Sequence, residues 1–188
     1  AIASSVVATL LGTLAAIGLN KMNKKLKSVV MTFTYLPMIN PEIITGVALM
    51  LLFIYLKMEF GMQTLIISHI TFNVPYVILN VLPKLRQMDR NLVDAAMDLG
   101  CTPLQALWKV VIPDIRPGIV SGFIMAFTMS LDDFVVSYFA GNGLHNNLSM
   151  YIYSAVGKAK GVNPAISTII FIPVVTLLLI VNIRSLRK

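Results

Sequence analysis

Long apolar runs alternate with short polar connectors along this chain. Five runs are candidates for membrane spans: residues 1–19, 29–56, 62–82, 119–140 and 166–183. A helix rises 1.5 Å per residue, so about 20 apolar residues cross the hydrocarbon core of a bilayer. Proline interrupts the second run at Pro37 and Pro41 and lies inside the fifth at Pro173, where we expect a kink. The pattern predicts an all-α, polytopic transmembrane bundle of five spans, with residues 1–188 in one domain.

One polar stretch, NLVDAAMDLGCTPLQALWKVVIP at residues 91–113, stands apart from these runs. Asn91 is expected to cap a helix, with Asp94 three residues later as its reciprocal partner. Gly100 is expected to take the left-handed conformation that ends a helix. The first half of the stretch therefore predicts a short helix closed by a glycine.

The second half of this stretch predicts another short helix. Thr102 supplies its cap, Pro103 takes the first helical position, and Gln105 completes a capping box. Its end is expected at Ile112 and Pro113, because the residue before a proline avoids the helical conformation. The helix carries an apolar stripe formed by Leu104, Leu107, Trp108 and Val111. A helix–glycine–helix unit with an apolar face either docks on a partner or lies along the membrane surface.

The composition agrees with a lipid environment. Of the 188 residues, 57% are hydrophobic and 12% are charged, with a mean hydropathy of +0.82, whereas soluble domains carry about 25% charged residues. The single cysteine, Cys101, excludes an internal disulfide framework. The opening run has no charged segment before it and is not interpreted as a signal peptide. The chain, which begins with Ala1, is expected to be the later part of a longer protein.

The distribution of lysine and arginine predicts the orientation of the chain, because cytoplasmic loops are enriched in both. With the N-terminus outside, 12 of the 15 basic residues fall on the inner side: Lys21, Lys24, Lys25, Lys27, Lys84, Arg86, Arg90, Lys109, Arg116, Arg184, Arg187 and Lys188. Lys57, Lys158 and Lys160 fall outside. The net charge of +7 is then spread over loop ends that face anionic lipid, which argues against nucleic acid as a partner.

Three carboxylates lie inside the predicted spans: Glu42 in the second, and Asp132 and Asp133 in the fourth. On continuous helices, Glu42 and Asp132 each lie roughly 21 Å from the inner edge of the membrane. An ionised side chain at mid-membrane costs roughly 2.5–3.5 kcal/mol, so such residues usually face a cavity or a pathway. No lysine or arginine lies deep in any predicted span. The acids therefore predict a cationic passenger.

Each acid also has a structural interpretation. Glu42 follows Pro41 and is equally compatible with the first turn of a restarted half-helix, where the helix dipole favours negative charge. Asp132 and Asp133 would point about 100° apart on a continuous helix. One of the two is then expected to face the pathway, while the other is held by a neighbour or protonated by burial. Tyr138 is a candidate for a cation–π contact with the passenger.

The polar stretch resembles the cytoplasmic EAA loop of permease subunits of ABC-type importers. That family's pattern is Glu-Ala-Ala, three residues, Gly, nine residues, then Ile-x-Leu-Pro. This chain has Asp94-Ala95-Ala96, Gly100 at the expected place, and Val110-Val111-Ile112-Pro113. LPMINPEIITG resembles the family's third-helix segment, and FTMSLDDFVVSYF resembles the fifth helix of spermidine/putrescine permeases. Such permeases have six spans, one of them before the point where this chain begins.

The resemblance implies a type I ABC importer permease fold without its first helix. It places the chain in a bacterial inner membrane, with the N-terminus outside and the C-terminus in the cytoplasm. Residues 83–118 would form a coupling loop that docks in a groove of an ABC ATPase dimer. The residues expected to carry this coupling are Asp94, Ala95, Ala96, Gly100, Leu104 and Pro113. The stripe with Trp108 would hold the loop to its own membrane domain.

Further partners implied by the resemblance are a second permease subunit and an extracytoplasmic substrate-binding protein. The sequence contains no G-x-x-x-x-G-K-[ST] phosphate loop. ATP and Mg²⁺ are therefore expected on a separate ATPase chain, with no cofactor on this one. The chain is expected to be a translocation subunit and not an enzyme.

The sequence thus predicts a permease subunit of an ATP-driven polyamine importer, with Glu42, Asp132, Asp133 and Tyr138 along the substrate pathway. The same class with another cation, such as iron or thiamine, is the first alternative. A secondary transporter or channel with a proton relay is the second, but the sequence shows no pair of repeated halves. A membrane enzyme is disfavoured, because no His/Asp/Glu cluster has catalytic spacing. His69 and His145 are interpreted as ordinary polar residues.

Overall fold

The computed structural model describes residues 1–89, 91–142, 149–150, 168–169 and 172. The chain divides into two compact units, Ala1–Asn147 and Leu148–Lys188, and every helix named below belongs to the first. The fifth predicted span, at residues 166–183, lies almost wholly outside the described residues. Most of the predicted outer loop at 141–165, including His145, also lies outside them.

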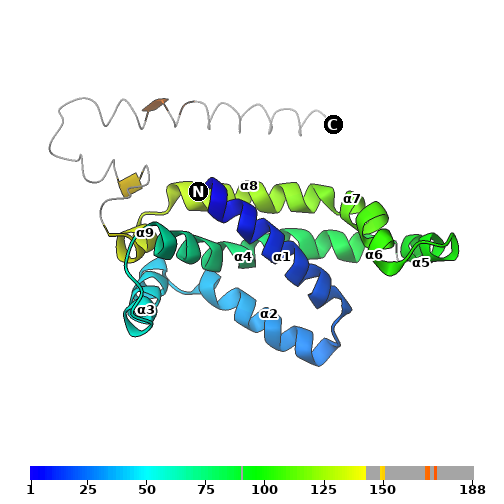
Figure 1. The fold of residues 1–188 in the computed structure, drawn as a ribbon, viewed down its shortest axis with the longest axis horizontal. Helices are drawn as coiled ribbons and strands as arrows, with labels where there is room; N and C mark the ends of the chain where they lie inside the picture. Colours follow the sequence, from blue (N-terminus) through cyan, green and yellow to red (C-terminus); the bar gives the residue numbers. More distant parts are fainter. Residues whose placement is uncertain (90, 143–148, 151–167, 170–171, 173–188) are drawn as a thin grey trace. The chain divides into compact units, whose positions relative to one another are not determined.

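The described part of the first unit is helical, which confirms the all-α prediction for these residues. Its elements are α1 (Ile2–Lys21), α2 (Lys24–Ile39), α3 (Glu42–Tyr55), α4 (Met62–Gln87), α5 (Asn91–Asp98), α6 (Pro103–Ala106), the π-helical turn η1 (Leu107–Val111), α7 (Ile112–Asp114), α8 (Arg116–Asp132) and α9 (Val135–Ala140). In Figure 1, α3 and α9 lie at one end of this unit, and α5, α6 and α7 lie at the other.

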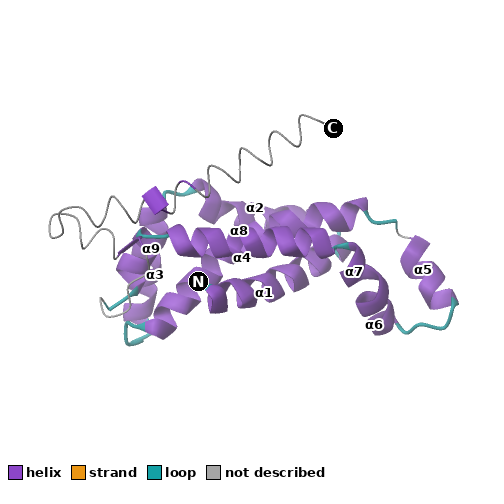
Figure 2. Ribbon diagram, turned by 90° about the horizontal axis from the view of Figure 1, so that it is seen from above, coloured by secondary structure: helices purple, strands orange, loops and turns teal. Residues whose placement is uncertain are grey.

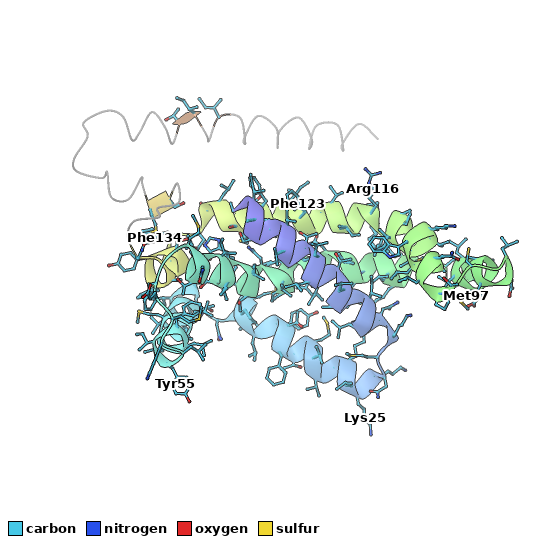
Figure 3. All side chains as sticks on the ribbon, viewed as in Figure 1. Lys25, Tyr55, Met97, Arg116, Phe123 and Phe134 are labelled. Atoms are coloured by element: carbon cyan, nitrogen blue, oxygen red, sulfur yellow. The ribbon has the colours of Figure 1, made fainter. Side chains whose placement is uncertain are left out.

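Two of the described helices, α1 and α4, are each long and apolar enough to cross a membrane. Two bent pairs also qualify if each pair is one span: α2 with α3, bent by 107°, and the segment Pro103–Asp114 with α8, bent by 67°. The described residues therefore hold two to four candidate spans, and the count of five stays a prediction. Tyr55, 82% exposed at the end of α3 (Figure 3), is one of many large apolar side chains on the outer surface. Apolar surface of this extent is typical of contact with lipid or with a partner.

Helices α1, α4 and α8 lie side by side and form the core of the unit (Figures 1 and 2). Small residues at every fourth position bring them together. On α8 the buried residues are Gly118, Gly122, Ala126 and Ser130. On α1 the residues with the same spacing are Ser4, Ala8, Gly12 and Ala16, all buried. Because lipid is as apolar as a leucine side chain, helices in a membrane associate through such close van der Waals packing.

The closest approach in this core is at Val77 of α4, which lies between two glycines. A Cβ atom built on Gly12 would lie 2.6 Å from the Val77 Cβ, and one built on Gly122 would lie 3.2 Å from the Val77 Cγ1. Ser4, Ser130 and His69 lie eight residues from Gly12, Gly122 and Val77 along their helices. Their side chains meet in a hydrogen-bonded group. The core is therefore apolar around Val77 and polar around Ser4, Ser130 and His69. The polar part lies next to the candidate functional site.

We expect Gly12→Ala to destabilise the bundle by about 1–3 kcal/mol, the range found for overpacked cores. The added methyl group would press on Val77, whose β-branched side chain cannot rotate out of the way. Gly18→Ala is the matched control in the same helix, because nothing lies within 4 Å of its Cβ position and alanine favours a helix. Thermal unfolding of the purified protein in detergent measures the difference. Equal melting temperatures for the two variants would contradict this packing.

The polar stretch forms α5, α6, η1 and α7, as a helix–glycine–helix unit. The second capping box is confirmed: the Thr102 Oγ1 accepts from the Gln105 N–H at 3.3 Å, and the Thr102 N–H donates to the Gln105 Oε1 at 2.9 Å. The predicted cap at Asn91 is wrong. Asn91 is the first residue of α5, and its N–H donates to the Asp89 carboxylate at 3.0 Å. An aspartate two residues earlier therefore takes the role expected of Asn91.

The predicted end of the second helix at Pro113 is also wrong, because helical structure continues through α7 to Asp114. The preceding turn, η1, is a π-helix. A π-turn is wider than an α-helical turn and gives room to the Pro113 ring, which in an α-helix clashes with the carbonyl four residues earlier. The expected apolar stripe is divided. Leu107 and Val111 pack on the core, whereas Leu104 and Trp108 are each 65% exposed.

Candidate functional site

Two broken helices meet at the candidate site. The first break separates α2 from α3 at Asn40 and Pro41, and α3 begins at Glu42. This position confirms the interpretation of Glu42 as a first-turn residue of a restarted half-helix, where the dipole favours a negative charge. The second break separates α8 from α9. Asp132 ends α8, and Asp133 follows it with extended dihedral angles, φ −62° and ψ 122°.

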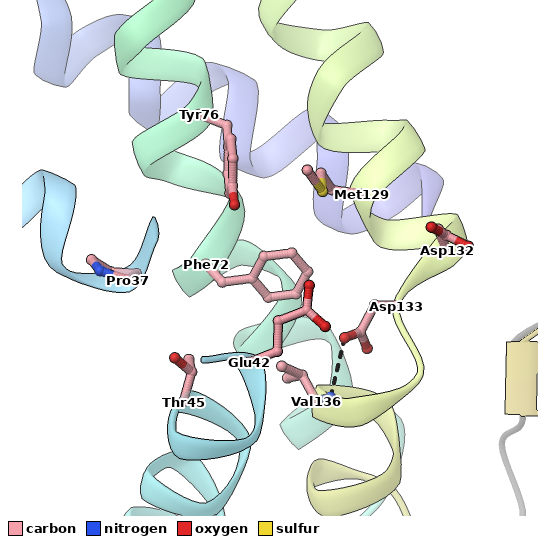
Figure 4. Close-up of a pocket in the computed structure, with 9 residues that line it drawn as sticks. All are labelled: Pro37, Glu42, Thr45, Phe72, Tyr76, Met129, Asp132, Asp133 and Val136. Carbon is pink, nitrogen blue, oxygen red and sulfur yellow. Dashed lines mark hydrogen bonds between the residues drawn. The ribbon is translucent and has the colours of Figure 1, made fainter. Parts of the chain in front are cut away.

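A pocket with a cavity volume of about 90 Å³ lies where these breaks approach α4 (Figure 4). It is lined by Pro37, Glu42, Thr45, Phe72, Tyr76, Met129, Asp132, Asp133 and Val136. All three carboxylates predicted from the sequence thus line one cavity, although Glu42 lies 90 residues away from Asp132 in the chain. No lysine or arginine is among the described residues that line it. Three acids around one cavity repel one another unless a cation or a proton is present.

Asp132 and Asp133 were expected to point about 100° apart on a continuous helix, with one facing the pathway and the other held by a neighbour. Because the chain leaves the helix at Asp133, both side chains line the same pocket. The depth of roughly 21 Å expected for Glu42 and Asp132 assumed continuous helices. That continuity holds for Asp132, because α8 is unbroken from Arg116 to Asp132, but not for Glu42, which follows the break between α2 and α3.

The two aspartates differ in their surroundings. Asp133 is buried, and its carboxylate accepts hydrogen bonds from the Val136 N–H at 3.1 Å and from the Ser137 N–H at 2.7 Å. These amides belong to the first turn of α9, so Asp133 supplies the side-chain cap of that helix. Asp132, the last residue of α8, is exposed and also lines the pocket. Asp133 is thus fixed by α9, whereas Asp132 is exposed where it lines the cavity.

Aromatic side chains from α4 complete the wall of the pocket. Phe72 and Tyr76 lie one helical turn apart and both line it. Aromatic faces attract cations, so they add to the effect of the acids. Tyr138, the aromatic candidate from the sequence, is 57% exposed, stacks on Phe134 with ring centroids 5.8 Å apart, and is not among the described lining residues. Its place along a pathway stays a prediction. Phe72 and Tyr76 are four residues apart, a spacing that places both on the same face of a helix. This spacing was the signal in the sequence for the aromatic pair that lines the pocket.

His69 is part of a buried hydrogen-bonded network behind the pocket, which the sequence analysis missed. Its Nδ1 lies 2.5 Å from the Ser130 Oγ, and its Nε2 lies 2.9 Å from the Ser137 Oγ and 3.4 Å from the Asp133 Oδ2. The Ser137 hydroxyl donates to the same Asp133 oxygen at 2.7 Å. His69 therefore contacts a predicted site residue, and is more than the ordinary polar residue that was expected. Across the described residues, no group of three or more His, Cys, Asp or Glu side chains is arranged to hold a metal ion.

A second candidate surface lies at the other end of the unit, on α5 and α6. Gly100 has φ +87°, which confirms its predicted left-handed conformation. The Cys101 N–H donates to the Ala96 carbonyl at 3.0 Å, and the Gly100 N–H donates to the Met97 carbonyl at 2.9 Å. This pair of bonds is the Schellman motif that closes a helix. The predicted coupling residues Asp94, Ala95, Gly100, Leu104 and Pro113 are exposed, and Ala96 is partly exposed.

Comparison with known proteins assigns this chain to a family. Residues 8–185 match the model of the family described as "Binding-protein-dependent transport system inner membrane component". The chain belongs to this family. The resemblance to importer permeases that was inferred from the polar stretch is thereby confirmed, and the chain is an inner membrane component of a transport system.

Individual members of this family are similar over most of the chain. The putrescine transport system permease protein PotI of Escherichia coli (strain K12) is 37% identical over 173 residues, which cover 88% of this chain and 61% of PotI. The spermidine/putrescine transport system permease protein PotC of the same strain is 34% identical over 181 residues, 96% of this chain and 68% of PotC. PotC of Haemophilus influenzae is 33% identical over 183 residues, covering 97% and 70%. The chain thus spans about three fifths of the length of PotI.

Proposed function

We propose that this chain is a permease subunit of an ATP-driven importer that moves polyamines, spermidine or putrescine, across the cytoplasmic membrane. The observation that carries the proposal is the pocket in which Glu42, Asp132 and Asp133 meet beside Phe72 and Tyr76. A polyamine carries several ammonium groups on an apolar chain, so it complements carboxylates and aromatic faces together. The names of the similar permeases, which specify putrescine and spermidine, support this cargo over iron or thiamine.

The proposed assembly contains this chain, a second permease subunit, an ABC ATPase dimer that holds ATP and Mg²⁺, and an extracytoplasmic binding protein. The exposed surface around α5 and α6 is proposed to dock on the ATPase. Two features support that role: α5 ends in a Schellman motif at Gly100, and the side chains of Leu104 and Trp108 are exposed. Exposed aromatic and aliphatic residues of this kind are typical of interface anchors. Closure of the ATPase dimer would then move α5 and α6, and through them the helices that carry the pocket.

Uptake by the reconstituted assembly tests the proposal. Proteoliposomes that contain the complete transporter and its binding protein are supplied with labelled spermidine or putrescine, with ATP or with a non-hydrolysable analogue inside. We expect polyamine accumulation that requires ATP hydrolysis, and no competition by excess thiamine or ferric ion. Accumulation of one of the competing cations instead would change the cargo, and uptake driven by a proton gradient without ATP would refute the importer itself.

The orientation of the chain gives a separate prediction. With the coupling loop in the cytoplasm, a cysteine at Asn142 should react with a membrane-impermeant thiol reagent added outside intact cells, and one at Gln87 should react only after permeabilisation. Both positions are exposed, so burial does not explain a difference between them. The variants are made in a Cys101→Ser background, because Cys101 is the single native cysteine. The reverse labelling pattern would contradict both the orientation and the proposed docking of α5 and α6 on a cytoplasmic ATPase.

A further inference from the structure

We propose that His69 is a positioning residue of the acidic pocket: through Ser137 it fixes Asp133, and so maintains the break between α8 and α9 that brings Asp132 and Asp133 to one cavity. This role rests on the proposed function, because it concerns the pocket that would carry the cation. It assigns a task to a buried histidine that lies outside the set of lining residues.

The hydrogen bonds determine how His69 acts. The Ser137 hydroxyl donates its single proton to the Asp133 Oδ2, so its oxygen faces the His69 Nε2 as an acceptor. His69 therefore carries a proton on Nε2 and donates it toward Ser137. The same Nε2 lies 3.4 Å from the Asp133 Oδ2. Ser137 thus transmits the orientation of the imidazole to the carboxylate.

The other side of the imidazole ring is anchored in the bundle core. Its Nδ1 pairs with the Ser130 hydroxyl of α8, and the Ser130 Oγ lies 3.1 Å from the Ser4 Oγ of α1. Four of these side chains, those of Ser4, His69, Ser130 and Ser137, are at most 3% exposed. A buried network whose members are all bonded holds one geometry, because breaking any bond leaves a polar group unpaired in a low-dielectric interior. The network therefore connects α1, α4, α8 and α9 at the break.

His69 also supports the pocket wall directly. Its ring contacts that of Phe72, with centroids 5.3 Å apart, and Phe72 lines the cavity. The His69 side chain thus supports two parts of the pocket wall, the Asp133 carboxylate and the Phe72 ring. A second bond fastens α9 to α4 nearby, from the Thr64 hydroxyl to the Ala140 carbonyl at 2.8 Å, so loss of the His69 contact should shift the pocket without releasing α9.

The electric field in the pocket provides a test that needs no cargo. A cysteine replaces Met129, which lines the pocket, in the assembled transporter with Cys101→Ser. The rates at which this cysteine reacts with a cationic and with an anionic methanethiosulfonate reagent are measured, and the ratio of the cationic rate to the anionic rate is compared between variants. The carboxylates should raise this ratio. Asp132→Asn calibrates how far the ratio falls when one charge is lost. We expect Ser137→Ala to lower the ratio by about threefold or more, because Coulomb energy depends on the distance to the displaced charge.

Two controls separate positioning from general damage to the fold. Ser68→Ala is matched to Ser137→Ala: both serines are fully buried, but the Ser68 hydroxyl bonds the Thr64 carbonyl of its own helix. It should leave the ratio unchanged. At position 69, His69→Gln places an amide donor near the former Nε2 and should retain the ratio, whereas the shorter side chain of His69→Asn reaches toward Ser130 and should not.

An unchanged ratio in Ser137→Ala, or equal ratios in His69→Gln and His69→Asn, would overturn the positioning role. Failure of Ser137→Ala and His69→Asn to assemble, with Ser68→Ala intact, would also overturn it, since the network would then be a requirement for folding. The outcome is independent of the cargo. A transporter that does not move polyamines refutes the proposed function, whereas a ratio insensitive to Ser137 refutes the positioning role alone.

Discussion

Asp132→Asn is expected to reduce polyamine uptake by about tenfold or more, which corresponds to a loss of about 1.4 kcal/mol in the interaction with the cation. The substitution preserves the shape of the side chain and removes its charge. Asp132 lines the cavity beside Glu42 and Asp133, with no basic residue among the described lining side chains. An ion pair in a partly desolvated cavity is stronger than a surface pair, which typically contributes about 0–1 kcal/mol. Initial rates of ATP-dependent uptake in proteoliposomes measure the loss.

Four further variants show whether the charge in the pocket causes the effect. Glu42→Gln should reduce uptake to a similar degree. Asp133→Asn should reduce uptake and also lower the melting temperature, because the Asp133 carboxylate caps α9. Glu59→Gln removes the same charge from an exposed position outside the described lining of the pocket and should leave uptake unchanged. Wild-type uptake in a Glu42→Gln/Asp132→Asn double variant would eliminate the charge argument.

Gly100→Val is expected to abolish most ATP-dependent transport while the protein still inserts in the membrane. Gly100 has φ +87°, and a left-handed conformation costs an L-residue roughly 1–2 kcal/mol, with β-branched residues among the least tolerant. The turn between α5 and α6 should therefore distort and lose its Schellman bonds. We expect co-purification with the ATPase and transport to fall together, by about tenfold or more.

The space around Gly100 allows a clean control for this prediction. Nothing lies within 4 Å of a Cβ atom built on it, so the size of a new side chain does not matter within the chain. Gly100→Asn should then retain most transport, because asparagine tolerates positive φ. Similar defects in Gly100→Asn and Gly100→Val would indicate that the surface at residue 100 must stay bare for the partner. Full activity in Gly100→Val would show that the conformation of this turn is irrelevant to coupling.

Local features of the chain were predictable from the sequence because each depends on neighbouring residues. The apolar runs correspond to α1, to α2 with α3, to α4, and to α8 with α9. Capping residues and a glycine marked the turn between α5 and α6, since a capping box and a positive φ need only a few residues. The family, too, was readable from the polar stretch at 91–113 and from the segments around Glu42 and Asp132.

The tertiary structure decided which residues meet and where the apolar runs break. Whether an apolar run stays continuous depends on how its neighbours pack, and the chain leaves α8 at Asp133, where the carboxylate is held by α9, Ser137 and His69. At that break the two adjacent aspartates line one pocket, whereas on a continuous helix they would point about 100° apart. The sequence alone determined a membrane permease with acids in its apolar segments. The fold determined that the acids share one cavity and that a histidine 64 residues from Asp133 supports it, because such contacts depend on helix packing and not on local spacing.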